Sequence, residues 1–227
     1  MKIAAVVQAR MSSSRLPGKV LLCISGKPLL GYVLDRVGHC QRLDDVIVAT
    51  SAEAVDNPVE EYCRGRNISV YRGSHADVAS RYVEVAQRNS LDAFVRVCAD
   101  SPLLDQDLIE HAVSIYFNSL PDMVTNIARR SYPKGQSVEV VCSRTFCRSY
   151  SAMESTIDKE HVTRYFYEHK SNYRIINFDS EKQLSHVQLS VDTQQDLERV
   201  TNIISKMARP HWEYGLEEIL QLNPDYI

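Results

Sequence analysis

The segment that follows the first apolar run of the chain combines positive charge with hydroxyl groups. Arg10, Arg15 and Lys19 supply three cations, and residues 12–14 are all serine. An arginine offers a rigid fork of donors for phosphate oxygens, and a lysine adds a compact point charge. The preceding run, residues 3–7, is typical of a buried strand. These residue types at the end of a strand suit the binding of a polyphosphate.

The sequence of this segment matches neither of two familiar phosphate-binding loops. The Walker A pattern requires a glycine where Ser13 stands, and a hydroxyl residue where Val20 follows Lys19. The glycine fingerprint of dinucleotide-binding folds is absent as well. A solvated basic turn that only aids solubility is the structural alternative. The position after an apolar strand favours function, because ligand sites of α/β sheets lie at the carboxyl ends of strands.

Two acids also stand at the ends of predicted strands. Asp100 follows the apolar run 94–98, and Asp192 follows the run 187–191. Two carboxylates that converge at this edge of a sheet could hold Mg²⁺, which prefers oxygen ligands. Each acid has a structural alternative, since Asp192 could cap a helix that begins at Thr193 and Asp100 could be a turn residue. The sequence alone leaves these alternatives open.

Residues 105–107, Asp-Gln-Asp, spell the metal-binding pattern of glycosyltransferases. They stand at the start of a predicted helix, where acids stabilise the positive end of the helix dipole. Asp105 is also a suitable N-cap. The structural interpretation is therefore favoured over a metal site.

The composition is that of an ordinary globular protein. The chain has 227 residues, of which 44% are hydrophobic and 24% charged, and this suits one large domain or two small ones. A net charge of -3 gives no basic excess for nucleic-acid binding, and no apolar span approaches the ~20 residues that cross a membrane. The six cysteines are scattered without a C-x-x-C pair, so neither a zinc site nor a redox motif is indicated. No signal peptide is indicated, and we expect a cytoplasmic protein with reduced thiols.

Strand-like and helix-like segments alternate along the first half of the chain. The predicted strands are 3–7, 46–50, 68–71 and 93–98, and the predicted helices are 28–37, 57–66, 76–89 and 105–117. Such alternation with short connections predicts an α/β protein with a mostly parallel sheet that is flanked by helices.

The pattern changes from residue 131 to residue 184. The predicted elements from there onward are a strand at 137–141, a helical stretch at 158–169, strands at 174–178 and 185–191, a long helix capped by Thr193, and a short helix at 213–222. The simplest interpretation is a single domain, residues 1–227, with an inserted lobe at approximately 131–184. Val162, Tyr165 and Phe166 give the helical stretch an apolar side, which could pack in a homodimer.

Several short motifs occur in the order of one known protein family. They are residues 7–11 (VQARM), 14–19 (SRLPGK), 26–30 (GKPLL), 48–51 (VATS), 71–74 (YRGS), 77–78 (DV) with 81–82 (RY), Asp100 with 102–103 (PL), 138–140 (VEV), 160–163 (EHVT), and 191–193 (VDT) with 196–197 (DL). The chain thereby resembles the spore coat polysaccharide biosynthesis protein F family, which is akin to the CMP-Kdo and CMP-sialic acid synthetases. The likeness spans residues 2 to about 205, and the opening motif is specific.

The resemblance implies a Rossmann-like nucleotide-diphosphosugar transferase fold. It also implies transfer of a cytidylyl group from CTP to a hydroxyl of a sugar or sugar acid, which releases pyrophosphate and activates the sugar for polysaccharide or glycan synthesis. By this likeness Arg10, Ser14, Arg15 and Lys19 would hold the triphosphate, Gln8 and Ala9 would border the base, and Ser51 and Arg81 would lie near the nucleoside. Asp100 and Asp192 would hold Mg²⁺, and Glu139, Glu160 and His161 would face the acceptor. The catalytic residues would be Arg15, Lys19, Asp100 and Asp192.

The chain departs from the family pattern mainly in the predicted lobe. Lys134-Gly135-Gln136 replaces a more usual Asp-Gly pair, and Arg164 replaces a common proline. Two smaller departures, Ala99 and Ser101, flank Asp100. His161 could act as a general base, since its unperturbed pKa lies near neutrality, or could merely bind the acceptor or face solvent. A glycosyltransferase that consumes a nucleotide-sugar and a non-catalytic nucleotide-binding protein are the alternative functions.

Overall fold

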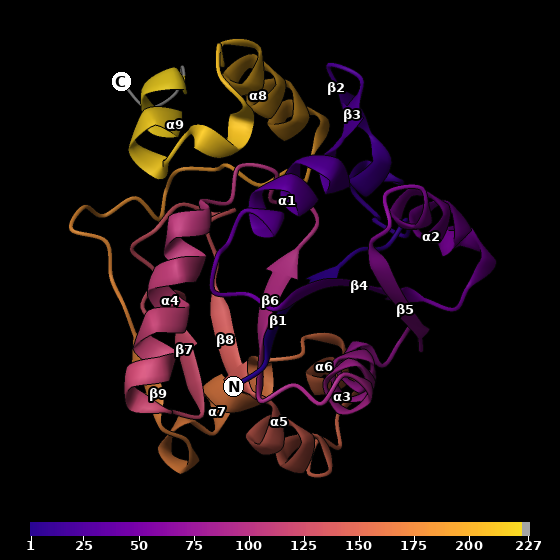
Figure 1. Ribbon diagram of the computed structural model, residues 1–227, viewed down its shortest axis with the longest axis vertical. Coiled ribbons are helices and arrows are strands. Elements are labelled where there is room, and N and C mark those ends of the chain that lie inside the picture. The colour runs from indigo at the N-terminus through magenta and orange to yellow at the C-terminus, as the bar shows by residue number, and fades with distance from the viewer. Residues whose placement is uncertain (224–227) are drawn as a thin grey trace.

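The computed structural model describes residues 1–223, so the last four residues of the predicted domain lie outside the described part. Its centre is a seven-stranded sheet in the order β5-β4-β1-β6-β8-β7-β9 (Figure 1). The strands are β1 (Ile3–Gln8), β4 (Asp45–Ser51), β5 (Ser69–Gly73), β6 (Ala93–Cys98), β7 (Met123–Thr125), β8 (Glu139–Cys142) and β9 (Ile175–Asn177). The first four in spatial order are parallel, and β8 runs antiparallel to β6 and β7. The predicted mostly parallel α/β sheet is confirmed.

Helices cover both faces of this sheet because its central strands are apolar on both sides. In β1, Ala5 and Val7 belong to one core cluster, and Ala4 and Val6 belong to the other. The first cluster is closed by α1, α2 and α4, and the second by α3, α5 and α7. The helices are α1 (Leu29–Gly38), α2 (Asn57–Arg64), α3 (Val78–Arg88), α4 (Gln106–Ser119), α5 (Ser143–Tyr150), α6 (Thr156–Glu160), α7 (Arg164–Glu168), α8 (Gln194–Ser205) and α9 (Leu216–Leu222).

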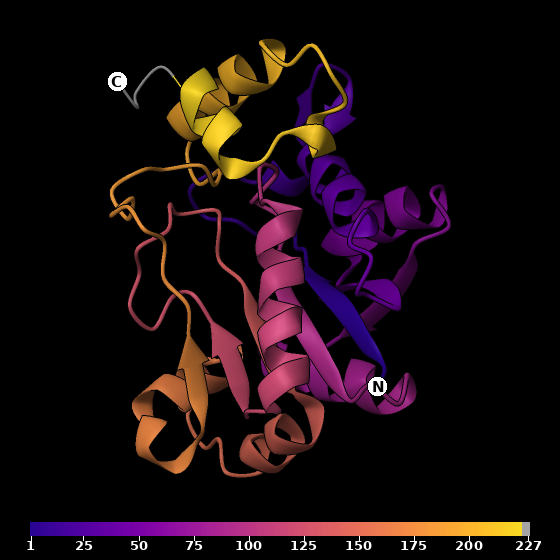
Figure 2. The ribbon, with the colours of Figure 1, turned by 60° about the vertical axis from the view of Figure 1, so that its left-hand side comes forward.

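The C-terminal helices α8 and α9 form a separate layer at one end of the molecule, opposite α5 and α7 (Figure 2). They share a third apolar cluster with α1 and with the small hairpin of β2 (Cys23–Ile24) and β3 (Lys27–Pro28). Short 3₁₀ helices complete the described part: η1 (Lys19–Leu21), η2 (Ala54–Asp56), η3 (Lys170–Asn172) and η4 (His211–Glu213).

The predicted strand at 185–191 is wrong. This segment makes a single bridge, between Gln188 and Lys134, and no strand is assigned to it within the described residues. Its apolar side chains, Val187, Leu189 and Val191, are buried in the third cluster. The run is apolar because it lies beneath α8 and α9, and not because it joins the sheet.

The predicted helical stretch 158–169 is broken into α6 and α7. Val162 between them has a φ of 44°, and the N–H of Thr163 donates to the carbonyl of His161 at 2.5 Å, which closes a tight turn. Val162 and Phe166 are fully buried in the second cluster. This apolar side is thus largely covered within the same chain, with Tyr165 partly buried, and the homodimer stays a prediction. The segment 131–184 also contributes β8 and β9 to the central sheet.

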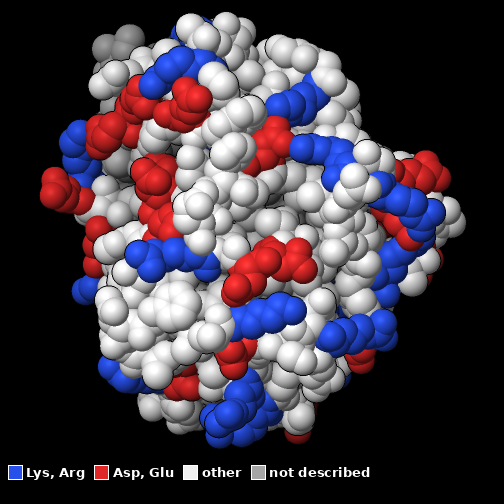
Figure 3. All heavy atoms as spheres, viewed as in Figure 1, with Lys and Arg blue, Asp and Glu red and all other residues white. Residues whose placement is uncertain are grey.

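Positive and negative side chains are interspersed over the face of the molecule that Figure 3 shows. None of the helices within residues 1–223 has both the length and the apolar character needed to cross a membrane.

Two charged residues of α1 attach the C-terminal layer to the sheet. Arg36 is fully buried and donates to the carbonyl oxygens of Leu104, His211 and Tyr214, at 3.3, 2.5 and 3.1 Å. Asp35 accepts from Lys27 at 2.6 Å and lies 3.2 Å from Nε2 of His211. Burial lowers the pKa of His211 to about 4. Burial would raise the pKa of Asp35, but its hydrogen bonds from Lys27, Arg66 and His211 lower it to about 2.

We expect acid to weaken the fold in two stages. Between pH 6.5 and about 4 the unfolded chain protonates His211 while the folded chain does not, so stability falls as the pH falls. Asp35 adds a second loss from about pH 4 down to about 2. The first stage amounts to on the order of 3 kcal/mol at most. Urea unfolding from pH 7 to 4 should show a shallower pH dependence for His211→Gln than for the wild type, and equal slopes would contradict this assignment.

Candidate active site

The ammonium of Lys19 joins the two acids that follow the predicted strands. Its Nζ lies 2.7 Å from Oδ2 of Asp100, 2.9 Å from Oδ1 of Asp192 and 2.8 Å from the carbonyl oxygen of Val191. Lys19 begins η1, Asp100 lies in the turn after β6, and Asp192 directly precedes the N-cap of α8. Residues that are 81 and 173 positions from Lys19 in the sequence are therefore brought to one point.

The charges at this point are nearly balanced and only partly buried. Burial would lower the pKa of the Lys19 ammonium, but the facing carboxylates of Asp100 and Asp192 outweigh that effect and raise it. Arg15 adds a second cation, with its guanidinium 2.8 Å from Oδ1 of Asp192. The Lys19 side chain is 10% exposed, whereas that of Arg15 is 64% exposed. Lys19 is thus a fixed charge of the site, and Arg15 is free to reorient toward a ligand.

Helix capping places Asp192 without using its side chain. Thr193 is the N-cap of α8 and forms a capping box with Asp196. The N–H of Asp192 donates to the Asp196 carboxylate at 3.1 Å, and the N–H of Val191 donates to the carbonyl of Asp100 at 2.8 Å. The cap alternative for Asp192 is therefore wrong, and its carboxylate is available to the site.

The Asp-Gln-Asp segment has the structural role that the sequence favours. Asp105 caps α4 by accepting from the N–H of Asp107, and its other oxygen accepts from the N–H of Leu216 at 2.6 Å. The side chain is buried against the C-terminal layer. It lines none of the three cavities described below.

A cavity of about 440 Å³ opens above Lys19, Asp100 and Asp192. Of the residues expected to bind the nucleotide, those that line it are Gln8, Arg10, Ser14, Arg15 and Lys19. Within residues 1–223 the buried Oε1 of Gln8 has no hydrogen-bond partner, so this oxygen is available to a ligand. His75, from the loop between β5 and α3, also lines the cavity, and its buried Nδ1 is likewise without a partner there.

The other three expected nucleotide residues are buried and do not line this cavity. Ala9 is 1% exposed and packs in the first core cluster. Ser51 is fully buried and donates to the carboxylate of Asp56. Arg81 is fully buried, where burial lowers its pKa, and it donates to the carbonyl of Ala49 at 3.4 Å. Among the described residues its Nε and one terminal nitrogen have no partner.

A second cavity, of about 230 Å³, adjoins the first and shares Cys98, Asp100 and Asp192 with it. Arg96, Arg130 and Lys134 line it. Sequence reasoning missed these three cations as site residues. Lys134 is marked in the sequence only by its departure from the family pattern, and the other two carry no local signal, because the fold alone brings them together.

The three residues expected to face the acceptor have different positions. Glu139 lines the second cavity but is 1% exposed, and it accepts from Arg96 and from the hydroxyl of Tyr167, both at 2.6 Å. Glu160 is exposed and lies 3.6 Å from Arg10. His161 is exposed and lies outside both cavities. The structure thus brings only Glu139 to the cavity wall.

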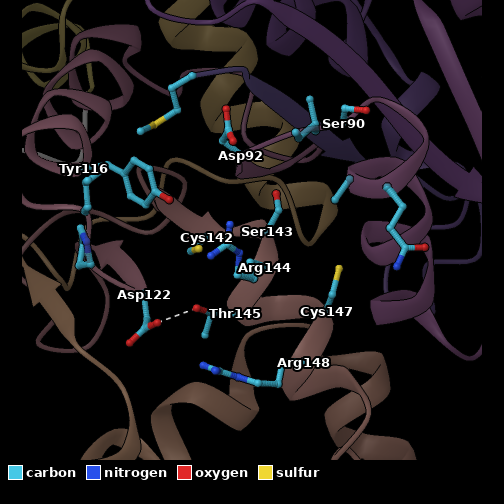
Figure 4. Close-up of a pocket in the computed structure, with 16 residues that line it drawn as sticks. Ser90, Asp92, Tyr116, Asp122, Cys142, Ser143, Arg144, Thr145, Cys147 and Arg148 are labelled. Atoms are coloured by element: carbon cyan, nitrogen blue, oxygen red, sulfur yellow. Dashed lines mark hydrogen bonds between the residues drawn. The ribbon is translucent and has the colours of Figure 1, made fainter.

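A larger cavity, of about 650 Å³, lies at the opposite end of the strands (Figure 4). Its acids are already engaged: Asp92 accepts from the N–H of Lys2 at 2.7 Å, and Asp122 accepts from the hydroxyl of Thr145 at 2.6 Å. None of the site residues predicted from the sequence lines it. The predicted site residues that line a cavity therefore gather at the carboxyl ends of the strands, where ligands of α/β sheets bind.

Comparisons with known proteins identify the family of the chain. The cytidylyltransferase family model matches residues 4–224. The spore coat polysaccharide biosynthesis protein SpsF of Bacillus subtilis is 29% identical, over 98% of this chain and 95% of its own. A 3-deoxy-manno-octulosonate cytidylyltransferase of Geobacter metallireducens is 36% identical, over 50% of this chain and 44% of its own. The structure of a cytidylyltransferase from Leptospira borgpetersenii is similar with a TM-score of 0.93 at 27% identity, and the match covers 98% of this chain and 93% of that one. The resemblance inferred from the motifs is confirmed, and the chain belongs to the cytidylyltransferase family.

Proposed function

We propose that the protein transfers the cytidylyl group of CTP to a hydroxyl of an acidic sugar, with release of pyrophosphate. The observation that carries this proposal is the position of Lys19, Asp100 and Asp192 at the junction of two cavities. One cavity is lined by the basic segment and suits a triphosphate. The other is lined by three cations and suits an anionic acceptor. The reacting atoms would meet where the cavities share their walls.

The first cavity would hold the nucleotide. Arg10, Arg15 and Lys19 would contact phosphate oxygens. The arginines would bind through their planar guanidinium groups, and the lysine would act as a compact point charge. The unpartnered Oε1 of Gln8 would accept from the amino group of cytosine, which uracil lacks. Ser51 and Arg81 would not contact the nucleotide directly. Ser51 would act through its hydrogen bond to Asp56, and Arg81 would act as a buried positive charge.

Asp100 and Asp192 fit a divalent cation. Both present a carboxylate oxygen within 2.9 Å of one ammonium nitrogen, so a cation already sits between them. No cluster of three or more metal-ligating side chains occurs within residues 1–223. This suits Mg²⁺, which is usually held by one or two carboxylates together with substrate phosphates. When bound, Mg²⁺ would polarise the α-phosphate and offset its charge.

The second cavity would hold the acceptor. Arg130 donates to the hydroxyl of Ser137 at 3.0 Å, and Lys134 lies on the same wall. Glu139 is occupied by Arg96 and Tyr167, so it would orient Arg96 and not contact the sugar itself. Arg130 and Lys134 are therefore the residues that would bind an acidic group of the acceptor. Glu160 and His161 lie outside this cavity, and we assign them no step in the reaction.

The reaction would be an in-line displacement. The acceptor oxygen forms a bond to the α-phosphorus, the bond from that phosphorus to the bridging oxygen of pyrophosphate breaks, and the hydroxyl proton passes to solvent. Lys19 and Arg15 would offset the charge that develops on the leaving oxygens. Such transfers depend mostly on positioning and on charge stabilisation. A homodimer and a cytoplasmic location, both expected from the sequence, stay predictions.

The direct test is a screen of CTP, UTP, ATP and GTP against a panel of sugar acids and neutral sugars, with pyrophosphate release as the readout. We expect release with CTP and an acidic sugar only. Release of UDP or GDP from a nucleotide-sugar would favour a glycosyltransferase, which the capping role of Asp105 disfavours. Binding of CTP without turnover on any acceptor would favour a non-catalytic protein.

We expect Arg130→Met to raise the KM for an acidic acceptor by about 10- to 100-fold, as for the loss of a hydrogen bond to a charged group. The KM for CTP should stay unchanged, because Arg130 lines the second cavity and not the first. The matched control is Arg129→Met, since the neighbouring Arg129 side chain is 77% exposed and pairs with Asp179. An equal effect of both substitutions would contradict the acceptor assignment.

A further inference from the structure

We propose that Asp56 is a positioning residue that holds the basic segment of residues 10–19 in its phosphate-binding shape. This inference rests on the proposed function, because it assumes that the segment binds the triphosphate of CTP. Asp56 does not line the nucleotide cavity, and it acts through the backbone of Met11.

The carboxylate of Asp56 reaches a segment 45 residues earlier in the chain. Its side chain is fully buried, and its Oδ1 accepts from the N–H of Met11 at 2.6 Å. Its Oδ2 accepts from the hydroxyl of Ser51, which also accepts from the N–H of Glu53 at 3.2 Å. Asp56 stands at the N-cap of α2, where an aspartate would ordinarily accept from its own helix. Here the carboxylate instead serves the basic segment.

Met11 passes this restraint to the rest of the segment. Its carbonyl accepts from the N–H of Ser13 and of Gly18, both at 2.9 Å. Gly18 has a φ of 70°, which glycine adopts without strain, and a Cβ at this position would lie 3.2 Å from Cε of Met11. Lys19 follows Gly18 directly. A continuous set of contacts therefore runs from the buried carboxylate through Met11 and Gly18 to the ammonium between Asp100 and Asp192.

The charge of Asp56 has a second consequence. Arg81, also fully buried, is close enough to Asp56 for the two charges to attract each other. The carboxylate thus anchors the segment through the hydrogen bond from Met11 and offsets the buried positive charge of Arg81. Without Asp56, the segment would have to be ordered by the ligand, and binding of the triphosphate would weaken.

The test compares binding of CTP with binding of cytidine, which has the base and ribose but no phosphate. For Asp56→Ala we expect CTP affinity to fall by about 10- to 100-fold, as for the loss of a hydrogen bond to a charged group, with cytidine affinity unchanged. Calorimetric titration measures the first and an NMR titration the second. Asp56→Asn keeps an oxygen that can accept from Met11, so it should restore CTP affinity toward that of the wild type.

A purely structural role would give a different result. Asp105→Ala is the matched control, because Asp105 is also buried and accepts from two backbone N–H groups. It should lower the unfolding temperature without changing the ratio of CTP to cytidine affinity. Equal losses of CTP and cytidine affinity in Asp56→Ala would overturn the proposal. If the wild type binds no CTP at all, the proposed function fails instead.

A measurement on the wild-type protein covers the case in which Asp56→Ala does not fold. The amide proton of Met11, which donates to the carboxylate, should exchange with solvent much more slowly than that of Ser12 in the nucleotide-free protein. Equally fast exchange at the two positions would show that Asp56 does not hold the segment, and would overturn the proposal.

Discussion

Lys19→Ala should slow pyrophosphate release by about 100-fold or more, as for the loss of one preorganised donor at the transition state. The ammonium makes three contacts of 2.7 to 2.9 Å, two of which reach the carboxylates of Asp100 and Asp192 at the junction of the two cavities. Among the described residues, the one other lysine that lines either cavity is Lys134, on the acceptor side. Removal of Lys19 therefore takes away the one compact charge that is fixed at this point. The loss should fall on kcat more than on the binding of cytidine.

A second readout for this variant is the binding of a metal ion by Asp100 and Asp192. In the nucleotide-free protein Lys19 occupies the space between Asp100 and Asp192, so its removal exposes both carboxylates to a competing cation. Binding of Mn²⁺ without CTP should thus be stronger in Lys19→Ala than in the wild type. Lys206→Ala is the matched control, because its ammonium donates to the carbonyl of Leu222 at 3.0 Å and lines neither cavity, so it should leave both readouts unchanged. An unchanged rate of pyrophosphate release in Lys19→Ala would remove it from the mechanism.

The parts of the fold that could be predicted from the sequence are those that depend on local pattern. The run at 46–49 is apolar because β4 is buried on both faces, and Thr193 and Asp105 precede helices as good caps do. The run at 187–191 shows where this reasoning stops. Periodicity reports that side chains are buried, but not whether they are buried in a sheet or beneath two helices.

The candidate site divides in the same way. The cations of the basic segment are close together in the sequence, and the acids mark strand ends, so both could be found. Asp56 and Arg130 could not be found in this way. Only the tertiary fold brings Asp56 to the N–H of Met11 and Arg130 to the wall of the second cavity. The resemblance placed Ser51 near the nucleoside, and the structure gives it a contact with Asp56. Its hydroxyl thus acts through the backbone of the basic segment.

Asp192→Asn should reduce Mg²⁺-dependent turnover by about 100-fold or more and shift the metal titration to higher concentration. The substitution keeps an oxygen that can accept from Lys19 and Arg15, so the shape of the site should persist while one negative charge is lost. Since Thr193 and not Asp192 caps α8, the unfolding temperature should change little. The effect would then be assigned to charge and not to folding.

The matched control is Asp179→Asn. Asp179 is an exposed acid that pairs with Arg129 and lines neither of the two cavities. Its metal titration should follow that of the wild type. Asp100 shares the Lys19 ammonium with Asp192, so Asp100→Asn should produce a similar loss, and the double variant should lose less than the two single losses combined. A metal titration of Asp192→Asn that matched the wild type would show that the two carboxylates serve to hold Lys19 in place and not to bind the metal.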